Sequence, residues 1–376
     1  MQHNWKRDCR SFLGNYACDM VKYNDVESCE ACDFYEQYTK KVLIIKLGAS
    51  GDVLRTTSLL PAIKAKYGNP MISWLTTDYN KAIIENNPLV DKIFVYDTDT
   101  VLRLQQEKFD VLFSLETTTP GTLLANLVRA DEKYGWYFHE DGHPSSFNQA
   151  ADHYLETQFS DKLNMENRKT YQEMMFEAVE LPYNKQDYIL KLSEKDLAYA
   201  KNFFSLYGVK DDDFVVAINP AAGSRWRSKN WSKERVVEFV RRLRRESDFK
   251  VIILGGPEEV DLMSFFMNQF NKENISVIFN NYNNTLGEFM GVVNRCNVVI
   301  ATDSLALHIA AALKKNTIAL FFATPPWEIE DYGRIKKFVS PLFDKYFFTD
   351  DYVEELASSI QPNDVLLAIK DYLAQQ

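Results

Sequence analysis

The segments of this sequence that could do chemistry are short loops of glycine or small residues that also carry charged or hydroxyl side chains. The first, Lys46-Leu47-Gly48-Ala49-Ser50-Gly51-Asp52, follows the apolar run 42–45 and precedes a helical pattern. A turn between a strand and a helix presents free backbone N–H groups and the positive end of the helix dipole, so it can bind an anion. The spacing Gly48-x-x-Gly51 lacks the third glycine of the dinucleotide fingerprint and gives a nicotinamide enzyme little support.

Asp52 stands in the first turn of the helix that this loop begins, where its carboxylate would point at a cleft. It could act on a substrate, or it could only stabilise the helix dipole, which is worth ~0.3–1 kcal/mol. The spacing alone leaves both readings open.

The second half of the chain contains two further loops of this kind. Ala221-Ala222-Gly223-Ser224-Arg225 follows an apolar run and precedes Lys229, so a ligand can approach the backbone while the cations neutralise a diphosphate. Gly255-Gly256 is followed by Glu258, which could accept hydrogen bonds from a ribose or a base, or could begin a helix.

The densest group of polar side chains is Thr302-Asp303-Ser304, followed after three residues by His308. It joins a strand end to a short apolar helix, and phosphate at such a helix start gains N–H donors and dipole stabilisation. His308 lies about one turn into the helix and could reach a phosphate or a sugar hydroxyl. A lone histidine is more often structural.

Four of the five cysteines, Cys9, Cys18, Cys29 and Cys32, fall within the first 32 residues. Cys29-x-x-Cys32 has metal-ligand spacing, and four thiolates suit a structural Zn or Fe ion. Free thiols are the alternative. Cys296 is expected to be a buried core thiol.

The length of 376 residues predicts two domains of ordinary size plus a small appendage. The net charge of −10 disfavours nucleic acid as a partner, although a local basic patch spans residues 225–235. We expect no transmembrane helix and no secretory signal peptide, and therefore a cytoplasmic protein with at most peripheral membrane contact.

Short β-branched runs alternate with helical patterns from residue 41 onward, which predicts an α/β protein with parallel sheets. The expected strands are 42–45, 71–75, 92–96, 110–115, 214–218, 251–254, 275–279, 298–301 and 317–322. We expect a cysteine segment at 1–40, a first domain at 41–190, a second domain at 191–358, and a C-terminal helix at 359–376 that packs back on the first domain. Helices are expected at 197–207, after Ser232, and at 363–373.

The order of these motifs resembles glycosyltransferase family 9, which includes the ADP-heptose heptosyltransferases. The resemblance rests on Lys46-x4-Gly51-Asp52-Val53, Lys229-Asn230-Trp231, Asp303-Ser304-x3-His308 and Phe322-Ala323-Thr324-Pro325. It implies the GT-B fold, in which two Rossmann-like domains with parallel sheets face each other across a cleft. It also implies that 41–190 is the acceptor domain and that 191–358 is the nucleotide-sugar domain. Leu305 and Ala323 stand where relatives often have glycine, and these departures leave the donor sugar open.

Carried over to this sequence, the resemblance makes Asp52 the catalytic base of an inverting glycosyl transfer. Lys46, Gly48 and Gly51 would support the acceptor loop, and the donor would contact a larger set: Ser224, Arg225, Lys229, Glu258, Thr302, Asp303, Ser304 and His308. The expected donor is ADP-heptose, and the acceptor a hydroxyl of a bacterial glycan, a lipopolysaccharide or a protein. No catalytic cofactor is expected. The alternatives are a nucleotide-sugar epimerase of the same architecture and an inactive metal-binding scaffold.

Overall fold

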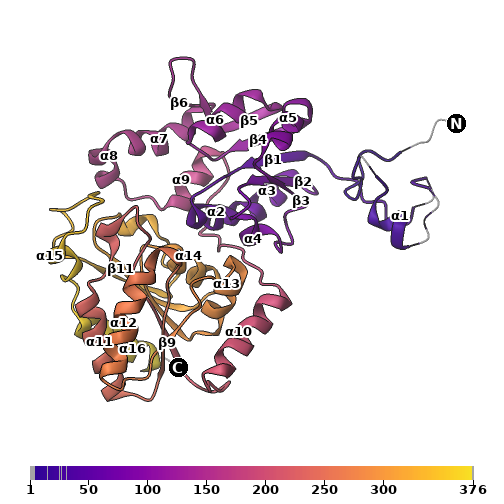
Figure 1. Cartoon of the computed structure of the whole chain (residues 1–376). Helices are drawn as coiled ribbons and strands as arrows, with labels where there is room; N and C mark the ends of the chain where they lie inside the picture. The colour runs from indigo at the N-terminus through magenta and orange to yellow at the C-terminus, as the bar shows by residue number, and fades with distance from the viewer. Residues whose placement is uncertain (1–4, 15, 25, 27, 31, 375–376) are drawn as a thin grey trace.

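The computed structural model describes residues 5–14, 16–24, 26, 28–30 and 32–374, and two six-stranded sheets dominate it (Figure 1). The first sheet has the order β3-β2-β1-β4-β5-β6, with every neighbouring pair parallel except β5 and β6. Its strands are β1 (Lys41–Ile45), β2 (Met71–Thr76), β3 (Lys92–Val95), β4 (Lys108–Ser114), β5 (Arg129–Phe138) and β6 (Pro144–Ser146).

The second sheet has the order β12-β11-β10-β7-β8-β9 and is parallel throughout. Its strands are β7 (Val215–Asn219), β8 (Lys250–Ile253), β9 (Ile278–Phe279), β10 (Val298–Thr302), β11 (Asn316–Phe321) and β12 (Ile335–Val339). Counted from its own first strand, each sheet therefore has the same order. The order reverses between β1 and β4 in one sheet and between β7 and β10 in the other, and ligands of such sheets bind at the carboxyl ends of these strands.

Helices cover both faces of each sheet, which explains why the central strands are continuously apolar. Around the first sheet lie α2 (Ser50–Thr56), α3 (Leu60–Tyr67), α4 (Lys81–Ile84), α5 (Thr98–Gln106), α6 (Thr119–Leu127), α7 (Asp152–Phe159), α8 (Asp161–Glu166) and α9 (Tyr171–Ala178). Around the second lie α10 (Glu194–Leu206), α11 (Lys233–Glu246), α12 (Val260–Lys272), α13 (Leu286–Arg295), α14 (Leu305–Ala312), α15 (Glu354–Ala357) and α16 (Pro362–Ala374). No described helix is long and apolar enough to cross a membrane.

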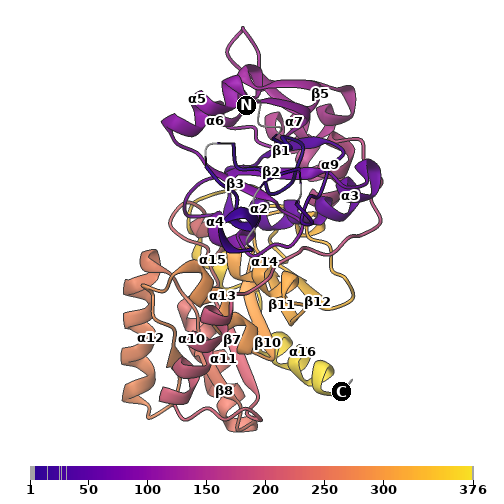
Figure 2. The same ribbon diagram turned by 90° about the vertical axis from the view of Figure 1, so that its right-hand side faces the viewer.

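The sequence predicts nine of these strands at nearly the right residues and does not predict β5, β6 or β12. The helix expected after Ser232 is α11, and the Ser232 hydroxyl accepts the Arg235 backbone N–H as an N-cap. The two sheets lie one above the other, with α2 and α14 between them, in both views (Figure 2).

The expected packing of the C-terminal helix on the first domain is wrong. Helix α16 packs on α11 and β11, and its apolar side joins the core of the second sheet through Val365, Leu366 and Ile369. The Tyr372 hydroxyl donates to the carbonyl of Thr317 at 2.9 Å. Helix α16 buries apolar side chains of α11 on this side of the sheet.

Candidate functional site

A cleft of about 720 Å³ separates the carboxyl ends of the two sheets. The loop after β1 and the start of α2 line it on one side, and the loops after β7, β8, β10 and β11 line it on the other. Polar and charged side chains from both halves therefore face the same space.

Asp52 lies in the first turn of α2 and lines this cleft. Its Oδ1 accepts a hydrogen bond from Arg55 Nη2 at 2.6 Å, and its Oδ2 lies 3.8 Å from Lys46 Nζ. Burial would raise the pKa of Asp52, but the charges of Arg55 and Lys46 outweigh that effect and hold the pKa below its ordinary value. Asp52 is therefore a carboxylate at neutral pH.

Glu116 fixes the glycine turn that carries Asp52. It follows β4, is 2% exposed, and accepts the backbone N–H groups of Leu47 at 3.0 Å and Gly48 at 3.2 Å. The same carboxylate lies 3.7 Å from Lys46 Nζ. Lys46 and Gly48 do not line the cleft. Lys46 lies behind the turn, and Gly48 is part of the turn that Glu116 holds.

Arg55 joins the two halves of the molecule. Besides its bond to Asp52, its Nη1 donates to the carbonyl oxygen of Glu328 at 3.5 Å and lies 4.0 Å from that residue's carboxylate. The guanidinium stacks 3.8 Å above the ring of Tyr171. Glu328 ends the 3₁₀ turn η5 (Pro326–Glu328), and burial raises the pKa of its carboxyl to about 7 although Arg55 opposes the shift.

The start of α14 faces Asp52 from the other side. Its N-cap residue, Ser304, makes no side-chain cap; instead the hydroxyl donates to Asn219 Oδ1 at 2.6 Å. Leu305 and Ala306, in the first turn of this helix, line the cleft. An uncapped helix start presents N–H groups to an anion.

Lys229 and Asp303 form an ion pair beside this helix start. Lys229 Nζ donates to Asp303 Oδ2 at 2.7 Å, and the Thr324 hydroxyl donates to the same oxygen at 2.8 Å. Burial would raise the pKa of Asp303, yet the Lys229 charge holds it well below its ordinary value. The ammonium has three N–H donors, so this pair leaves donors for a ligand.

His308 is a contact between the two halves. It is 6% exposed, and its ring lies against Gly51, where an added Cβ would be only 2.4 Å from His308 Cδ2. Burial and the nearby Arg55 charge lower the pKa of His308 to about 3, so the imidazole is neutral at neutral pH. It can offer a hydrogen bond to a ligand but no positive charge.

The loop after β7 is held by the loop after β8. The backbone N–H of Ser224 donates to Glu258 Oε2 at 2.7 Å, and that of Gly223 donates to Glu259 Oε1 at 3.0 Å. Ser224 and Arg225 are exposed on the cleft wall.

The structure brings most of the predicted site residues to one cleft, namely Gly51, Asp52, Ser224, Arg225, Lys229, Glu258, Asp303, Ser304 and His308. Thr302 does not line it, because this residue is the buried last residue of β10. Sequence reasoning missed Arg55, Glu116 and Glu328. The position of Arg55, one turn after Asp52 on the same helix face, was an available signal.

The amino-terminal cysteines lie apart from the cleft. Cys9, Cys18, Cys29 and Cys32 are free thiols that line one small cavity of about 20 Å³. Cys296 is buried as expected, and burial raises the pKa of its thiol to about 12.

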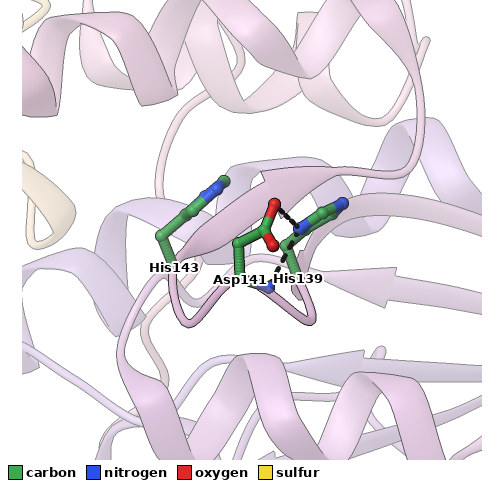
Figure 3. A group of neighbouring side chains, drawn as sticks. All are labelled: His139, Asp141 and His143. Carbon is green, nitrogen blue, oxygen red and sulfur yellow. Dashed lines mark hydrogen bonds and ion pairs between the residues drawn. The ribbon is translucent and has the colours of Figure 1, made fainter.

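A second group of ligand-type side chains occupies the turn between β5 and β6 (Figure 3). The ligand atoms of His139, Asp141 and His143 lie within 4.8 Å of one another, and His139 Nδ1 is 3.2 Å from Asp141 Oδ2. This hairpin projects from the first sheet on the side away from the second sheet. Its residues follow no motif that predicts a site from the sequence.

Comparison with known proteins relates this geometry to a family. The sequence profile of glycosyltransferase family 9 (heptosyltransferase) matches residues 100–345. A lipopolysaccharide heptosyltransferase 1 from Campylobacter coli is 20% identical over 365 residues, which cover 89% of this chain and 100% of that protein.

Two solved structures resemble the whole molecule. A family 9 glycosyl transferase from Veillonella parvula DSM 2008 matches with a TM-score of 0.72 and 19% identity, over 91% of this chain and 99% of that one. The ADP-heptose lipopolysaccharide heptosyltransferase II of E. coli matches with a TM-score of 0.68 and 19% identity, over 89% of this chain and 99% of that one.

Proposed function

The chain belongs to glycosyltransferase family 9, and we propose that it transfers a heptose from ADP-heptose to an acceptor hydroxyl with inversion at the anomeric carbon. It is a glycosyltransferase with the GT-B fold. The ADP-heptose donor is proposed because the E. coli relative is named for that donor. The acceptor is a bacterial glycan, a lipopolysaccharide or a protein.

One observation carries the proposal: an ionised carboxylate, Asp52, faces an uncapped helix start and an ammonium group, Lys229, across one cleft. Glycosyl transfer from a nucleoside diphosphate requires a base for the acceptor and stabilisation of a departing anion. The two halves of the molecule supply one requirement each.

On the donor side, the diphosphate lies at the start of α14. The backbone N–H groups of that helix and the free N–H donors of Lys229 stabilise the charge that develops on the leaving nucleoside diphosphate. Asp303 holds the ammonium in place through its 2.7 Å bond. Arg225 adds a second cation on the same wall.

On the acceptor side, Asp52 takes the proton of the acceptor hydroxyl. At the same time the hydroxyl oxygen bonds to the anomeric carbon, and the bond between that carbon and the diphosphate oxygen breaks. Arg55 and Lys46 keep Asp52 ionised before the reaction, but the same charges weaken it as a base. An acceptor hydroxyl that displaces Arg55 from Oδ1 removes that hydrogen bond and makes Asp52 a stronger base.

The test is to incubate the purified protein with ADP-heptose in separate reactions that each contain one acceptor: lipopolysaccharide, a glycan or a protein. The amount of ADP released and the mass of the acceptor are measured in each reaction. We expect ADP release in step with an acceptor mass increase of one heptose. An isomerised donor without ADP release would identify an epimerase. A donor that is neither bound nor consumed, across ADP-, UDP-, GDP- and dTDP-sugars, would identify a scaffold.

A further inference from the structure

The four amino-terminal cysteines converge on one place although they are spread over 24 residues of sequence. Cys9 forms an isolated antiparallel β-bridge with Gln37, Cys18 is the N-cap of α1 (Asp19–Tyr23), and Cys29 and Cys32 form the last pair. All four line the same cavity, whose volume of about 20 Å³ holds roughly one water-sized sphere. A single ion fits such a space.

The segment around these thiols has no apolar core. None of the residues described between 5 and 40 is buried, and α1 buries no residue. Hydrophobic burial therefore cannot order this part of the chain, and small units of this kind need a disulfide or a metal ion. The structure contains the thiols and no disulfide among its described residues.

We propose that Cys9, Cys18, Cys29 and Cys32 bind one thiophilic transition-metal ion, Zn²⁺ or iron, through four thiolates. Binding displaces the thiol protons and leaves a negatively charged centre, and Lys6, which lines the same cavity, offsets part of that charge. Within the part of the chain that the structure describes, three ligand atoms come within 4.8 Å only at His139, Asp141 and His143. No three of the four sulfur atoms lie this close together, so binding of an ion must bring the sulfur atoms closer to one another around the cavity.

The position of the segment makes the ion structural. Arg10 forms an ion pair with Asp91, and Lys92 Nζ donates to the carbonyl of Phe12 at 3.3 Å. Asn69 Nδ2 donates to the carbonyl of Gln37 at 3.0 Å. Residues 69, 91 and 92 stand at the amino ends of β2 and β3, whereas the cleft lies at the carboxyl ends. The segment projects sideways from the first sheet (Figure 1).

The experiment measures Zn and Fe by elemental analysis in the full chain, purified without chelators under reducing conditions. The variants are the double variant Cys29→Ser/Cys32→Ser, the control Cys296→Ser, and the control His139→Ala/His143→Ala. We expect about one ion per chain in the wild type and in both controls. The Cys29→Ser/Cys32→Ser variant should lose it.

A second measurement does not depend on how well the double variant folds. The wild-type protein is stripped of metal with a chelator, and Co²⁺ alone is added; thiolate ligation gives an intense sulfur-to-cobalt charge-transfer band. The band should appear at one equivalent, and Zn²⁺ should abolish it. Absence of the band would overturn the proposal, as would metal content that survives in Cys29→Ser/Cys32→Ser or disappears in His139→Ala/His143→Ala.

Discussion

At the scale of residues, a row of alternating charges starts at Lys46, behind the cleft wall, and continues along the cleft through Asp52, Arg55 and Glu328. Each neighbouring pair in this row lies within 4.0 Å, and the row begins in one half of the molecule and ends in the other. The arrangement keeps Asp52 ionised while burial keeps Glu328 close to its titration point at neutral pH. The two carboxyl groups therefore have different protonation behaviour in one site.

Lys229→Ala should weaken donor binding by ~1.5–3 kcal/mol, because a charge-assisted hydrogen bond to the diphosphate is lost. Calorimetry with ADP measures this. The matched control is Lys233→Ala, which removes an ammonium group at the start of α11 that does not line the cleft. Wild-type affinity in the Lys229 variant would remove this residue from the site.

Glu328→Gln should change how the free energy of unfolding depends on pH. The native carboxyl has a pKa of about 7 and its ordinary value is 4.5, so between these values the folded state binds more protons than the unfolded state. The stability that this group contributes is complete below 4.5 and is lost as pH rises through 7. The glutamine variant does not titrate.

Melting temperatures of wild type and Glu328→Gln, measured from pH 4.5 to 8, give the test. The variant should gain stability relative to wild type as the pH rises and reach a constant difference above about 7. A difference that does not change with pH would show that Glu328 has an ordinary pKa.

Residue types at strand ends predicted much of the site, because Asp52, Lys229, Asp303 and Ser304 stand next to glycine or small residues after apolar runs. Glu116 and Glu328 were not found in this way. Glu116 contacts the Leu47 N–H, which is 69 positions away in sequence, and Glu328 contacts Arg55, which is 273 positions away. Only the folded chain brings such groups together.

At the scale of elements, α2 and α14 pack against each other where both line the cleft. Gly51 allows the two helices to approach, since any side chain there would meet the His308 ring. The proposed base and the proposed donor-binding helix start are thus held on two elements in direct contact.

Gly51→Ala should destabilise the protein by ~1–3 kcal/mol and lower turnover, because the added methyl group forces the two helices apart. The double variant Gly51→Ala/His308→Ala tests the cause, since removal of the ring opens space for the methyl group. We expect the two substitutions together to cost less than the sum of their separate effects in denaturant unfolding. Strictly additive effects would show that the clash is absent.

Element prediction succeeded where apolar runs are continuous and failed where they are not. β1 and β10 are buried along most or all of their length, and their positions follow from the sequence. β5 begins with Arg129-Ala130-Asp131-Glu132-Lys133, of which none is buried, so it shows no strand signal at its start. Helix α16 was found, but its partner was not, because an amphipathic face does not specify which apolar surface covers it.

At the scale of the whole molecule, two sheets of the same order face each other with their carboxyl ends toward one cleft. The first sheet presents the proposed base, and the second presents the helix start and the cations proposed to bind the donor. Donor binding should therefore depend on the second sheet alone. At a donor concentration of one hundred times Kd, it should stabilise the folded state by ~2.7 kcal/mol and so raise the melting temperature.

The most direct test of this division is Asp52→Asn, which keeps the shape of the side chain but cannot accept the proton. With ADP-heptose and a saturating acceptor, kcat should fall by about 10²–10⁴, while calorimetry should give a nearly unchanged donor affinity. The melting temperature is measured alongside, because a helix-stabilising role alone would cost under ~1 kcal/mol and leave turnover nearly intact. Near-normal turnover in Asp52→Asn would contradict the account.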